Sequence, residues 1–391
     1  EIADPKNDFN LNLPRYIDST EPEDLQDIDA HLRGGIPDRD LDALAPYWQV
    51  FPAVRSALFE PAGRSGYSQL RVAPADIKPT IFGHAEFTAF IAAANERFAQ
   101  WKAANVPHLR GFAQDGHPKA LIGTIAEALL LTFERAPLLD AYDIYQHLMD
   151  YWGETMQDDC YLIAADGWVA AAQPRLIIED RTSKTKTRPD FTLGRKKYAA
   201  ELIPPALIIA RYFAQEQSAI DALEAQLATL AQQMEEMAEE HGGEGGLLED
   251  ARNDKDKITK ASVAARLKEI GKGDSDTADE RQVLQKYLIL IEQEADTGAK
   301  HKAAQDALMA KVAAKYGQLT EDEIKTLVVD DKWLATLAAA VQSELDRVSQ
   351  TLTGRIRQLA DRYATPLSIA FAFVASASRM TAFVAESRAR I

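Results

Sequence analysis

Apolar residues recur at helical spacing through most of the chain. Between residues 21 and 165 they return every three or four positions, and glycine and proline separate the stretches. This pattern predicts helices near 22–33, 40–60, 84–104, 119–134 and 141–157. Alternating or strand-forming stretches predict short strands in NDFNLNLPRYID (7–18), GYSQLRVAP (66–74) and CYLIAADGW (160–168). The first part of the chain is therefore expected to be rich in helix, with a few short strands.

The second half of the chain predicts three long amphipathic helices. The first has an apolar seam that is broken only at Glu216 and consists of Phe213, Ile220, Leu223, Leu227, Leu230, Met234 and Met237. The glycines of HGGEGG (241–246) predict the end of this helix. The second helix has apolar positions at Leu284, Tyr287, Leu288 and Ile291, and the third, from about Trp333 to Tyr363, at Leu337, Val341, Leu345, Val348, Leu352, Ile356 and Leu359. Each seam needs a partner surface, provided by another of these helices or by another chain.

These signals predict a mostly α protein in three regions. Residues 1–20 are expected to end a preceding domain, and residues 21–200 to form an α-rich helical domain. Residues 201–391 are expected to form a region of long, coiled-coil-like helices, with a separate tail at 366–391. Before the third long helix, LTEDEI (319–324) predicts a capping box, in which Thr320 and Glu323 each bind the other's backbone amide.

Composition and charge narrow the functional classes. The chain has 391 residues, of which 46% are hydrophobic and 27% charged, as expected for a folded protein of two or three domains. Its net charge of −16 gives no overall attraction to DNA, so any DNA contact must come from a local patch. Cys160 is the only cysteine, which excludes an internal disulfide and fits a reducing cytoplasm. We expect a cytoplasmic protein without a membrane span, since Arg379 interrupts the longest apolar run, and we expect Glu1 to be a cut end.

One local stretch is basic. From Arg175 to Arg211 there are nine positive charges and four acidic ones, whereas the next forty residues hold ten acidic residues and no lysine or arginine. A solvated loop followed by an acidic helix face explains this pattern equally well. The candidate phosphate contacts are Arg181, Lys184, Lys186, Arg188, Arg195, Lys196 and Lys197.

No catalytic or metal-binding motif is recognisable. The G-x-G triplets, in HGGEGG and at 271–273, follow helices in charged surroundings and predict linkers and helix starts. The seven histidines show no metal-ligand spacing, and Asp158 and Asp159 are expected to be a solvated pair at a helix end. We therefore assign no catalytic, cofactor-binding or metal-binding residue to this chain.

Four stretches, spread over nearly the whole chain, resemble the modification (M) subunit of type I restriction-modification systems. They are NDFNLNLPRYID (7–18), YDIYQHLMDYWGETMQDDCYLI (142–163), ELIPPALIIARYFAQEQSAIDALEAQ (201–226) and LTEDEIKTLVVDDKWLATL (319–337). Such long matched strings of unlike residue types rarely arise from helix periodicity alone. In that family, sequence similar to NDFNLN closes the methyltransferase domain. The resemblance therefore implies that residues 1–20 end this domain and that its catalytic motifs lie upstream.

The resemblance implies a part in adenine-specific DNA methylation. The family transfers a methyl group from S-adenosylmethionine to the amine of an adenine that is flipped out of the duplex. The implied partners are the specificity subunit, a second modification subunit, a restriction subunit and DNA. This part of the subunit is expected to hold no cofactor and to be inactive alone, S-adenosylmethionine being the cofactor of the full-length parent. Because the family's carboxy-terminal helices pack on the specificity subunit, the contact candidates are Phe213, Ile220, Leu223, Leu227, Leu230, Met234, Met237, Leu345, Val348 and Leu352.

Two alternatives remain open at the level of sequence. The tail 366–391 departs from the charged, helical close of the family, which fits either a truncated or frameshifted gene or a divergent docking tail. The acidic seam helix also suits a self-associating coiled-coil scaffold without a catalytic role. Methyl transfer by an unrecognised site has no motif to support it.

Overall fold

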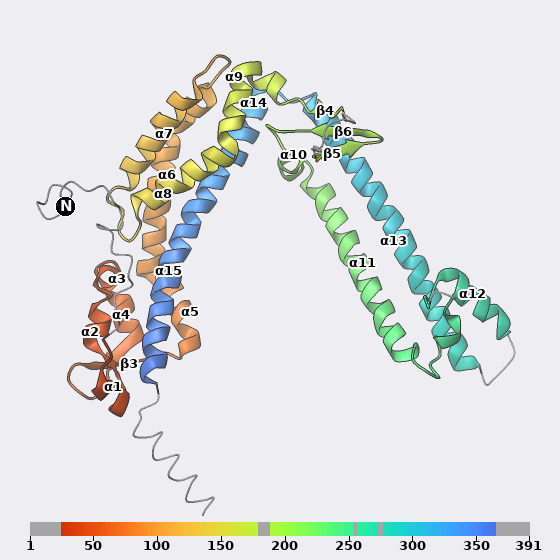
Figure 1. Cartoon of the computed structure of the whole chain (residues 1–391), viewed down its shortest axis with the longest axis horizontal. Coiled ribbons are helices and arrows are strands. Elements are labelled where there is room, and N and C mark those ends of the chain that lie inside the picture. Colours follow the sequence, from red (N-terminus) through yellow and green to blue (C-terminus); the bar gives the residue numbers. More distant parts are fainter. Residues whose placement is uncertain (1–24, 179–187, 254–255, 272–276, 365–391) are drawn as a thin grey trace, which may run out of the picture. The chain divides into compact units, whose positions relative to one another are not determined.

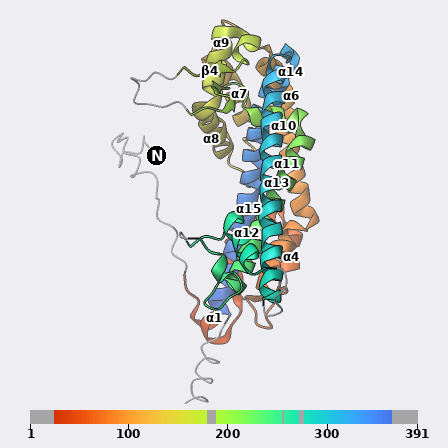
Figure 2. The same ribbon diagram turned by 90° about the vertical axis from the view of Figure 1, so that its right-hand side faces the viewer.

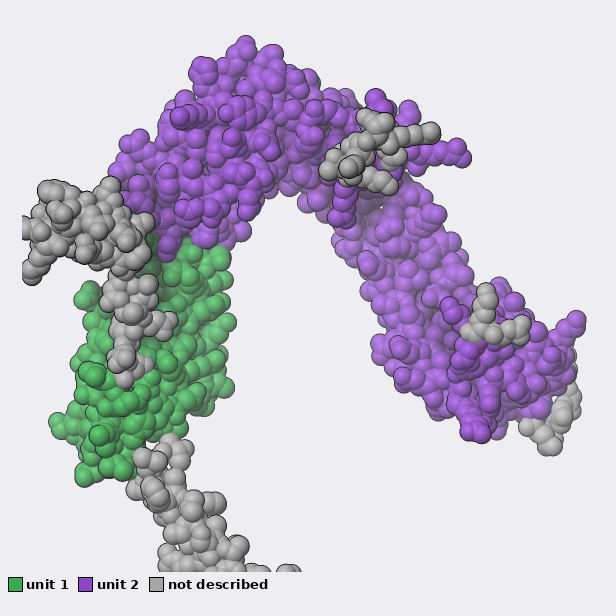
Figure 3. Space-filling model, viewed as in Figure 1, with its two compact units in different colours: residues 1–97, 135–140, 342–391 green, residues 98–134, 141–341 purple. Residues whose placement is uncertain are grey.

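The computed structural model describes residues 25–178, 188–253, 256–271 and 277–364. Most of them are helical and the strands are short and antiparallel, so the predicted mostly α class is confirmed. The chain forms two compact units, coloured separately in Figure 3. Unit 1 comprises residues 1–97, 135–140 and 342–391, and unit 2 comprises residues 98–134 and 141–341. Among the described residues, unit 1 thus combines 25–97 with 342–364, whereas the predicted division lies near residue 200.

Unit 1 contains short helices and a three-stranded sheet. The sheet has the antiparallel order β1-β3-β2, made by β1 (Ile36–Pro37), β3 (Tyr67–Leu70) and β2 (Phe59–Pro61). Its short helices are α1 (Ile28–Arg33), α2 (Asp38–Asp42), α3 (Ala45–Val50), α4 (Pro52–Leu58) and α5 (Ile77–Phe82). Two long helices, α6 (Ala85–Gly111) and α15 (Ala335–Tyr363), each have one part in unit 1 and the other in unit 2.

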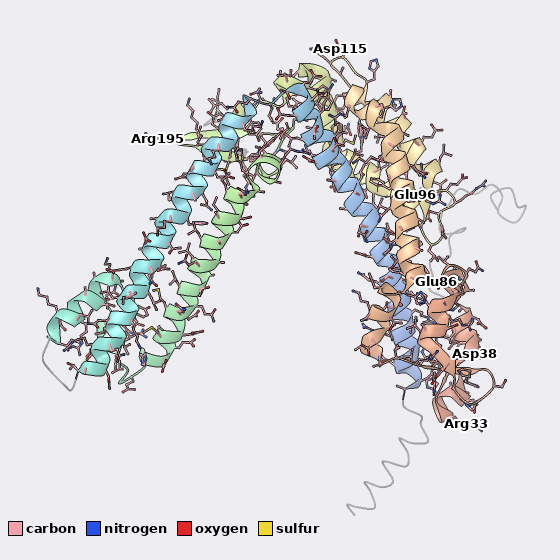
Figure 4. The ribbon with its side chains drawn as sticks, turned by 180° about the vertical axis from the view of Figure 1, so that it is seen from behind. Arg33, Asp38, Glu86, Glu96, Asp115 and Arg195 are labelled. Carbon is pink, nitrogen blue, oxygen red and sulfur yellow. The ribbon has the colours of Figure 1, made fainter. Side chains whose placement is uncertain are left out.

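Helix α6 contributes a buried aromatic contact at the start of α4 and a carboxylate that caps the first turn of α4. The rings of Phe51 and Phe87 pack with centroids 5.6 Å apart, and both side chains are fully buried. The carboxylate of Glu86, labelled in Figure 4, accepts hydrogen bonds from the backbone N–H groups of Ala53 (2.9 Å) and Val54 (3.2 Å). These donors have no partner inside α4, because the first turn of a helix leaves its N–H groups free. One residue of α6 therefore fixes where α4 begins.

Unit 2 contains most of the longer helices and a second small sheet. The sheet has the antiparallel order β4-β6-β5, made by β4 (Arg175–Leu176), β6 (Lys196–Ala199) and β5 (Phe191–Leu193). Two π-helical segments, η3 (Trp152–Met156) and η5 (Thr326–Leu334), continue helices on either side of them. The α-helices are α7 (Pro118–Phe133), α8 (Ala141–Tyr151), α9 (Gln157–Ala171), α10 (Pro205–Tyr212), α11 (Ala214–His241), α12 (Lys260–Glu269), α13 (Ala278–Tyr316) and α14 (Glu321–Lys325).

Helices α11 and α13 lie side by side as a long hairpin (Figures 1 and 2). Near the start of α11, Glu216 accepts a 2.9 Å hydrogen bond from Lys311, and further along Leu227 lies against Gly298. Residue numbers therefore rise along α11 as they fall along α13, so the two helices are antiparallel. We call this pair the α11–α13 hairpin.

The far end of the hairpin has its own small core. Helix α12 packs there against α13, and the buried residues of this cluster are Leu248, Ala251, Val263, Leu284 and Tyr287. Methionines 234 and 237 of α11 pack against the cluster from the other side. The end of α11 at His241, followed by Gly242 as its cap, confirms the helix end predicted from HGGEGG. The hairpin is thus held together at its end as well as along its length.

Most predicted helices are present, but two predicted elements differ. The helix expected at 40–60 is three short helices and a strand, because Pro46 and Pro52 each start a new helix. The strand expected at 160–168 is wrong, since these residues belong to α9. Cys160 and Ile163 are buried three positions apart, which is helical rather than strand spacing. The predicted strand in 7–18 and the tail 366–391 lie outside the described residues.

The capping box predicted before α14 is confirmed. The Glu323 N–H donates to the Thr320 hydroxyl (3.3 Å), and the Thr320 N–H donates to the Glu323 carboxylate (2.9 Å). That carboxylate also accepts hydrogen bonds from Lys315 (2.8 Å) and the Tyr212 hydroxyl (3.0 Å). The lysine first, and then the backbone N–H of Thr320, lower the pKa of Glu323 to about 2.

This lowered pKa predicts a pH-dependent loss of stability in Glu323→Gln. The folded protein binds this proton less readily than the unfolded chain, whose value stays near the usual 4.5, so the charged glutamate stabilises the fold above that pH. The contribution is lost as the pH falls from about 4.5 towards about 2. Urea unfolding should therefore show a deficit in Glu323→Gln at neutral pH that shrinks on acidification. The matched control, Glu321→Gln in the same turn, removes a more exposed ion pair and should show a smaller deficit; equal deficits would contradict the prediction.

Candidate functional site

The predicted basic stretch lies on the small sheet of unit 2. Strands β5 and β6 are joined by a two-residue turn of Gly194 and Arg195, and Gly194 has a φ of +61°. Such turns need a positive φ, which glycine adopts without strain. Figure 4 labels Arg195 at the end of this β5–β6 hairpin. The described members of the stretch are all exposed, namely Arg188, Arg195, Lys196 and Lys197, whereas Arg181, Lys184 and Lys186 lie outside the described residues.

An aromatic stack anchors the sheet to α13. The ring of Phe191 stacks on Tyr198 of β6, with centroids 5.1 Å apart, and on Tyr316 of α13, with centroids 5.9 Å apart. The Tyr316 hydroxyl donates a 2.6 Å hydrogen bond to the carbonyl of Ile203, and burial raises its pKa above the usual range. The cations of the β5–β6 hairpin are therefore carried by a sheet whose base is fixed.

The seam of α11 faces α13 of the same chain. Ile220 and Leu230 are buried, at 4% and 6% exposure. The other five seam residues stay partly exposed: Phe213, Leu223, Leu227, Met234 and Met237. The sequence leaves open whether another helix of this chain or another chain covers this seam. In the structure, α13 of the same chain lies along it. Helix α13, together with the small core that packs against Met234 and Met237, covers the seam only in part.

The α15 residues predicted to contact a partner are inside unit 1. Leu345, Val348 and Leu352 have exposures of 0%, 4% and 1% within the chain itself. Ser349 and Thr353, which are polar, are also buried, so the covered part of α15 is wider than the apolar side predicted from sequence. These leucines and the valine offer no surface to another chain in this structure, so a contact with a partner must use other residues.

The π-helical segment η5 forms a polar junction that sequence reasoning missed. Its residues 330–333 (Asp-Asp-Lys-Trp) are called the DDKW segment. Asp330 accepts a 2.7 Å hydrogen bond from Arg110 of α6, and Asp331 accepts two, of 2.5 and 2.7 Å, from Arg211 of α10. A π-helix turns its side chains by a different angle from an α-helix, so consecutive residues can reach different neighbours. The DDKW segment thereby ties several helices of unit 2 together.

The centre of this junction is a buried ion pair. The Lys332 ammonium donates to both oxygens of Asp159 on α9, at 2.8 and 2.7 Å, and to the carbonyl of Leu202 at 2.9 Å. The indole N–H of Trp333 also donates to Asp159, at 2.8 Å. Asp159 is only 4% exposed, so the solvated position expected for it is wrong. Burial raises the pKa of this carboxyl, and the nearby ammonium and indole oppose that shift.

The neighbouring thiol is not poised for reaction. Burial raises the pKa of Cys160 to about 12, which keeps it protonated near neutral pH and therefore a poor nucleophile. Across the described ranges, no group of three histidine, cysteine, aspartate or glutamate side chains is arranged to hold a metal ion. No helix among the described residues is long and apolar enough to cross a membrane. The hydrogen bonds of the buried polar junction join η5 to α6, α9 and α10.

The sequence held a partial signal for this junction. The two aspartates, lysine and tryptophan at 330–333 were within one of the four family-like stretches, and Asp159 was within another. A charged residue inside an otherwise apolar helical stretch is a sign of buried pairing. Only the fold, however, brings residues 159 and 332 together.

Comparison of the chain with protein-family models, with curated proteins and with solved structures found no match.

Proposed function

We propose that the chain is the carboxy-terminal part of a type I restriction-modification M subunit and that its α11–α13 hairpin docks on helices of the specificity subunit. The observation that carries the docking role is the incompletely covered seam of α11. Five of its seven residues stay partly exposed although α13 runs along α11 and the small core at the far end of the hairpin packs against Met234 and Met237. An apolar stripe of this length is stable when further helices cover it, as in a four-helix bundle.

The polar surface of the hairpin supports docking on a protein rather than on DNA. Between Tyr212 and Ala251 there are ten acidic residues and no lysine or arginine. A helix with this charge repels phosphates, so the α11 side of the hairpin suits a partner that offers apolar and basic side chains. In a completed bundle, apolar seams supply the affinity, and charged residues beside them select the partner.

The proposed parent complex methylates adenine in DNA with S-adenosylmethionine. In this proposal the cofactor and the catalytic motifs belong to the upstream part of the subunit, and the chain described here contributes assembly and support for DNA binding. A second M subunit, a restriction subunit and DNA are the further proposed partners. The buried DDKW junction supports such a role, because it fixes the helices from which the α11–α13 hairpin extends.

Co-purification with the cognate specificity subunit tests the proposal. We expect the unaltered chain to co-elute and Leu223→Asp to lose this association, because Leu223 is a partly exposed member of the seam. The matched control is Leu131→Asp, which places the same charge on α7 at a leucine that is 63% exposed; it should co-elute normally. Circular dichroism of both variants checks that the helices persist.

The opposite outcomes distinguish the alternative, a self-associating scaffold. That alternative has the same partly exposed seam in its favour, since a second copy of the hairpin would also cover it. Light scattering at micromolar concentration separates the two: a monomer that gains mass only with the specificity subunit supports docking. A stable oligomer of the chain alone, lost in Leu223→Asp, combined with no co-elution, would replace docking by self-association.

A further inference from the structure

The β5–β6 hairpin carries cations and apolar residues in an ordered arrangement. Leu193 pairs with Lys196 across the two strands, and Phe191 pairs with Tyr198. Because side chains of a strand alternate between its faces, Leu193 and Lys196 share the face of the Phe191 stack. That face is covered by α13 at Phe191, which is 6% exposed, and is open at Leu193, which is 38% exposed. The outer end of the hairpin is therefore an exposed face with a fixed base.

The cations of this surface have few local counter-charges. Asp190 accepts a 2.6 Å hydrogen bond from the backbone N–H of Ala200, and Glu201 is paired with Arg175. Among the described residues, no carboxylate lies within ion-pair distance of Arg188, Arg195 or Lys196. Exposed cations that form no ion pair with any described residue are available to attract an external anion.

We propose that this surface, made by Leu193, Arg195 and Lys196, binds the sugar-phosphate backbone of duplex DNA without reading its sequence. The inference rests on the proposed function, which makes DNA the substrate of the complex, and it names where this chain touches that substrate. At its outer end, beyond the pairing of β6 with β4, the β5–β6 hairpin is a two-stranded ribbon, which is narrow enough to enter the major groove of DNA. Its lysine and arginine side chains can neutralise phosphates. The exposed Leu193 side chain adds an apolar contact for the deoxyribose.

The distribution of charge favours DNA over an acidic protein segment. The basic stretch ends where α11 begins, and the following forty residues are acidic without a single lysine or arginine. Duplex DNA is thereby attracted at the small sheet and repelled by the acidic α11 that follows it. The surface thus separates two partners: DNA at the small sheet and the specificity subunit at the long helices.

The test is binding of the full chain to a labelled duplex of random sequence, measured by fluorescence anisotropy over a series of salt concentrations. In the double variant Arg195→Gln with Lys196→Gln, affinity at low salt should fall about tenfold, and the slope of log affinity against log salt should decrease by about two, since each phosphate contact contributes about 0.9. The matched control, Lys257→Gln with Lys268→Gln, removes two exposed cations near α12 and should change neither quantity. Arg195→Lys should keep the salt slope of the unaltered chain, because lysine and arginine each neutralise one phosphate.

Three outcomes overturn the inference. The first is an unaltered affinity and slope in the double variant, or no salt-dependent binding by the chain at all. The second is an equal loss in the control, which would indicate a general effect of net charge. The third is normal DNA binding together with lost co-elution with the specificity subunit, which would make this surface a protein interface. The two proposals are tested by different measurements. Docking is tested by co-elution with the specificity subunit, which Leu223→Asp should abolish, whereas DNA binding is tested by the salt slope, which Leu223→Asp should leave unchanged.

Discussion

Replacing Lys332 by methionine is expected to lower the free energy of unfolding of unit 2 by about 3–5 kcal/mol, because it leaves the buried Asp159 carboxylate without its counter-charge. The side chains of Lys332 and Asp159 are 11% and 5% exposed, so water cannot replace the lost partner. Methionine keeps most of the volume of the lysine stem, and the loss is therefore electrostatic. Urea unfolding followed by tryptophan fluorescence measures it, since Trp333 donates directly to Asp159.

A double-mutant cycle separates the ion pair from other effects of the substitution. Asp159→Asn should also destabilise unit 2, because it leaves the Lys332 ammonium buried and unpaired. The double variant Asp159→Asn with Lys332→Met should cost less than the two single changes together, since it leaves no unpaired buried charge. As a control, Lys300→Met breaks the Asp296–Lys300 pair on α13, in which both side chains are 64% exposed, and should leave the stability nearly unchanged. Additive losses in the cycle would refute a coupled, buried pair.

The sequence predicted the helical scaffold well because helices are encoded locally. The seam from Phe213 to Met237 and the glycines after it gave the bounds of α11 closely, and the Thr320–Glu323 capping box is present. Both signals depend on residues within one or two helical turns. The strand predicted at 160–168 is wrong because the local pattern there is weak: the short apolar run between Asp159 and Asp166 has no clear periodicity. Burial of Cys160 and Ile163, which decides the helix, is a property of the tertiary fold.

The candidate sites depended on contacts that sequence spacing does not encode. Nothing near Leu345 indicates that it is buried, because α15 meets parts of the chain that are far away in sequence, as where Tyr363 donates to Asp40, 323 positions away. The prediction that Asp159 is solvated is wrong for the same reason: its partner, Lys332, is separated from it by 173 residues. The cluster of cations on the β5–β6 hairpin can be predicted because these residues are adjacent in sequence. The stacking of Phe191 on Tyr316, which supports the hairpin, cannot be predicted in this way, because the two rings are far apart in sequence.

Replacing Leu230 by aspartate should unfold the α11–α13 hairpin locally. Leu230 is 6% exposed and its side chain belongs to the seam facing α13, so the substitution removes a large apolar contact and buries a charge without a partner. Truncation of such a leucine alone costs about 2–5 kcal/mol, and an unpaired buried charge adds to that loss. Hydrogen exchange should therefore show lost protection across α11 and α13.

The extent of this loss decides how the hairpin is coupled to the rest of unit 2. The small core of Leu248, Val263 and Tyr287 lies at its far end, and the DDKW junction anchors α10 through Arg211 at the near end. If the hairpin opens as a cooperative unit, α7, α8 and α9 keep their protection while α11, α12 and α13 lose it. Thr229→Ala, at the exposed neighbouring position, should change neither group. Loss of protection throughout unit 2 would instead show that the hairpin stabilises the helices around the junction, so that a partner covering the seam would stabilise them as well.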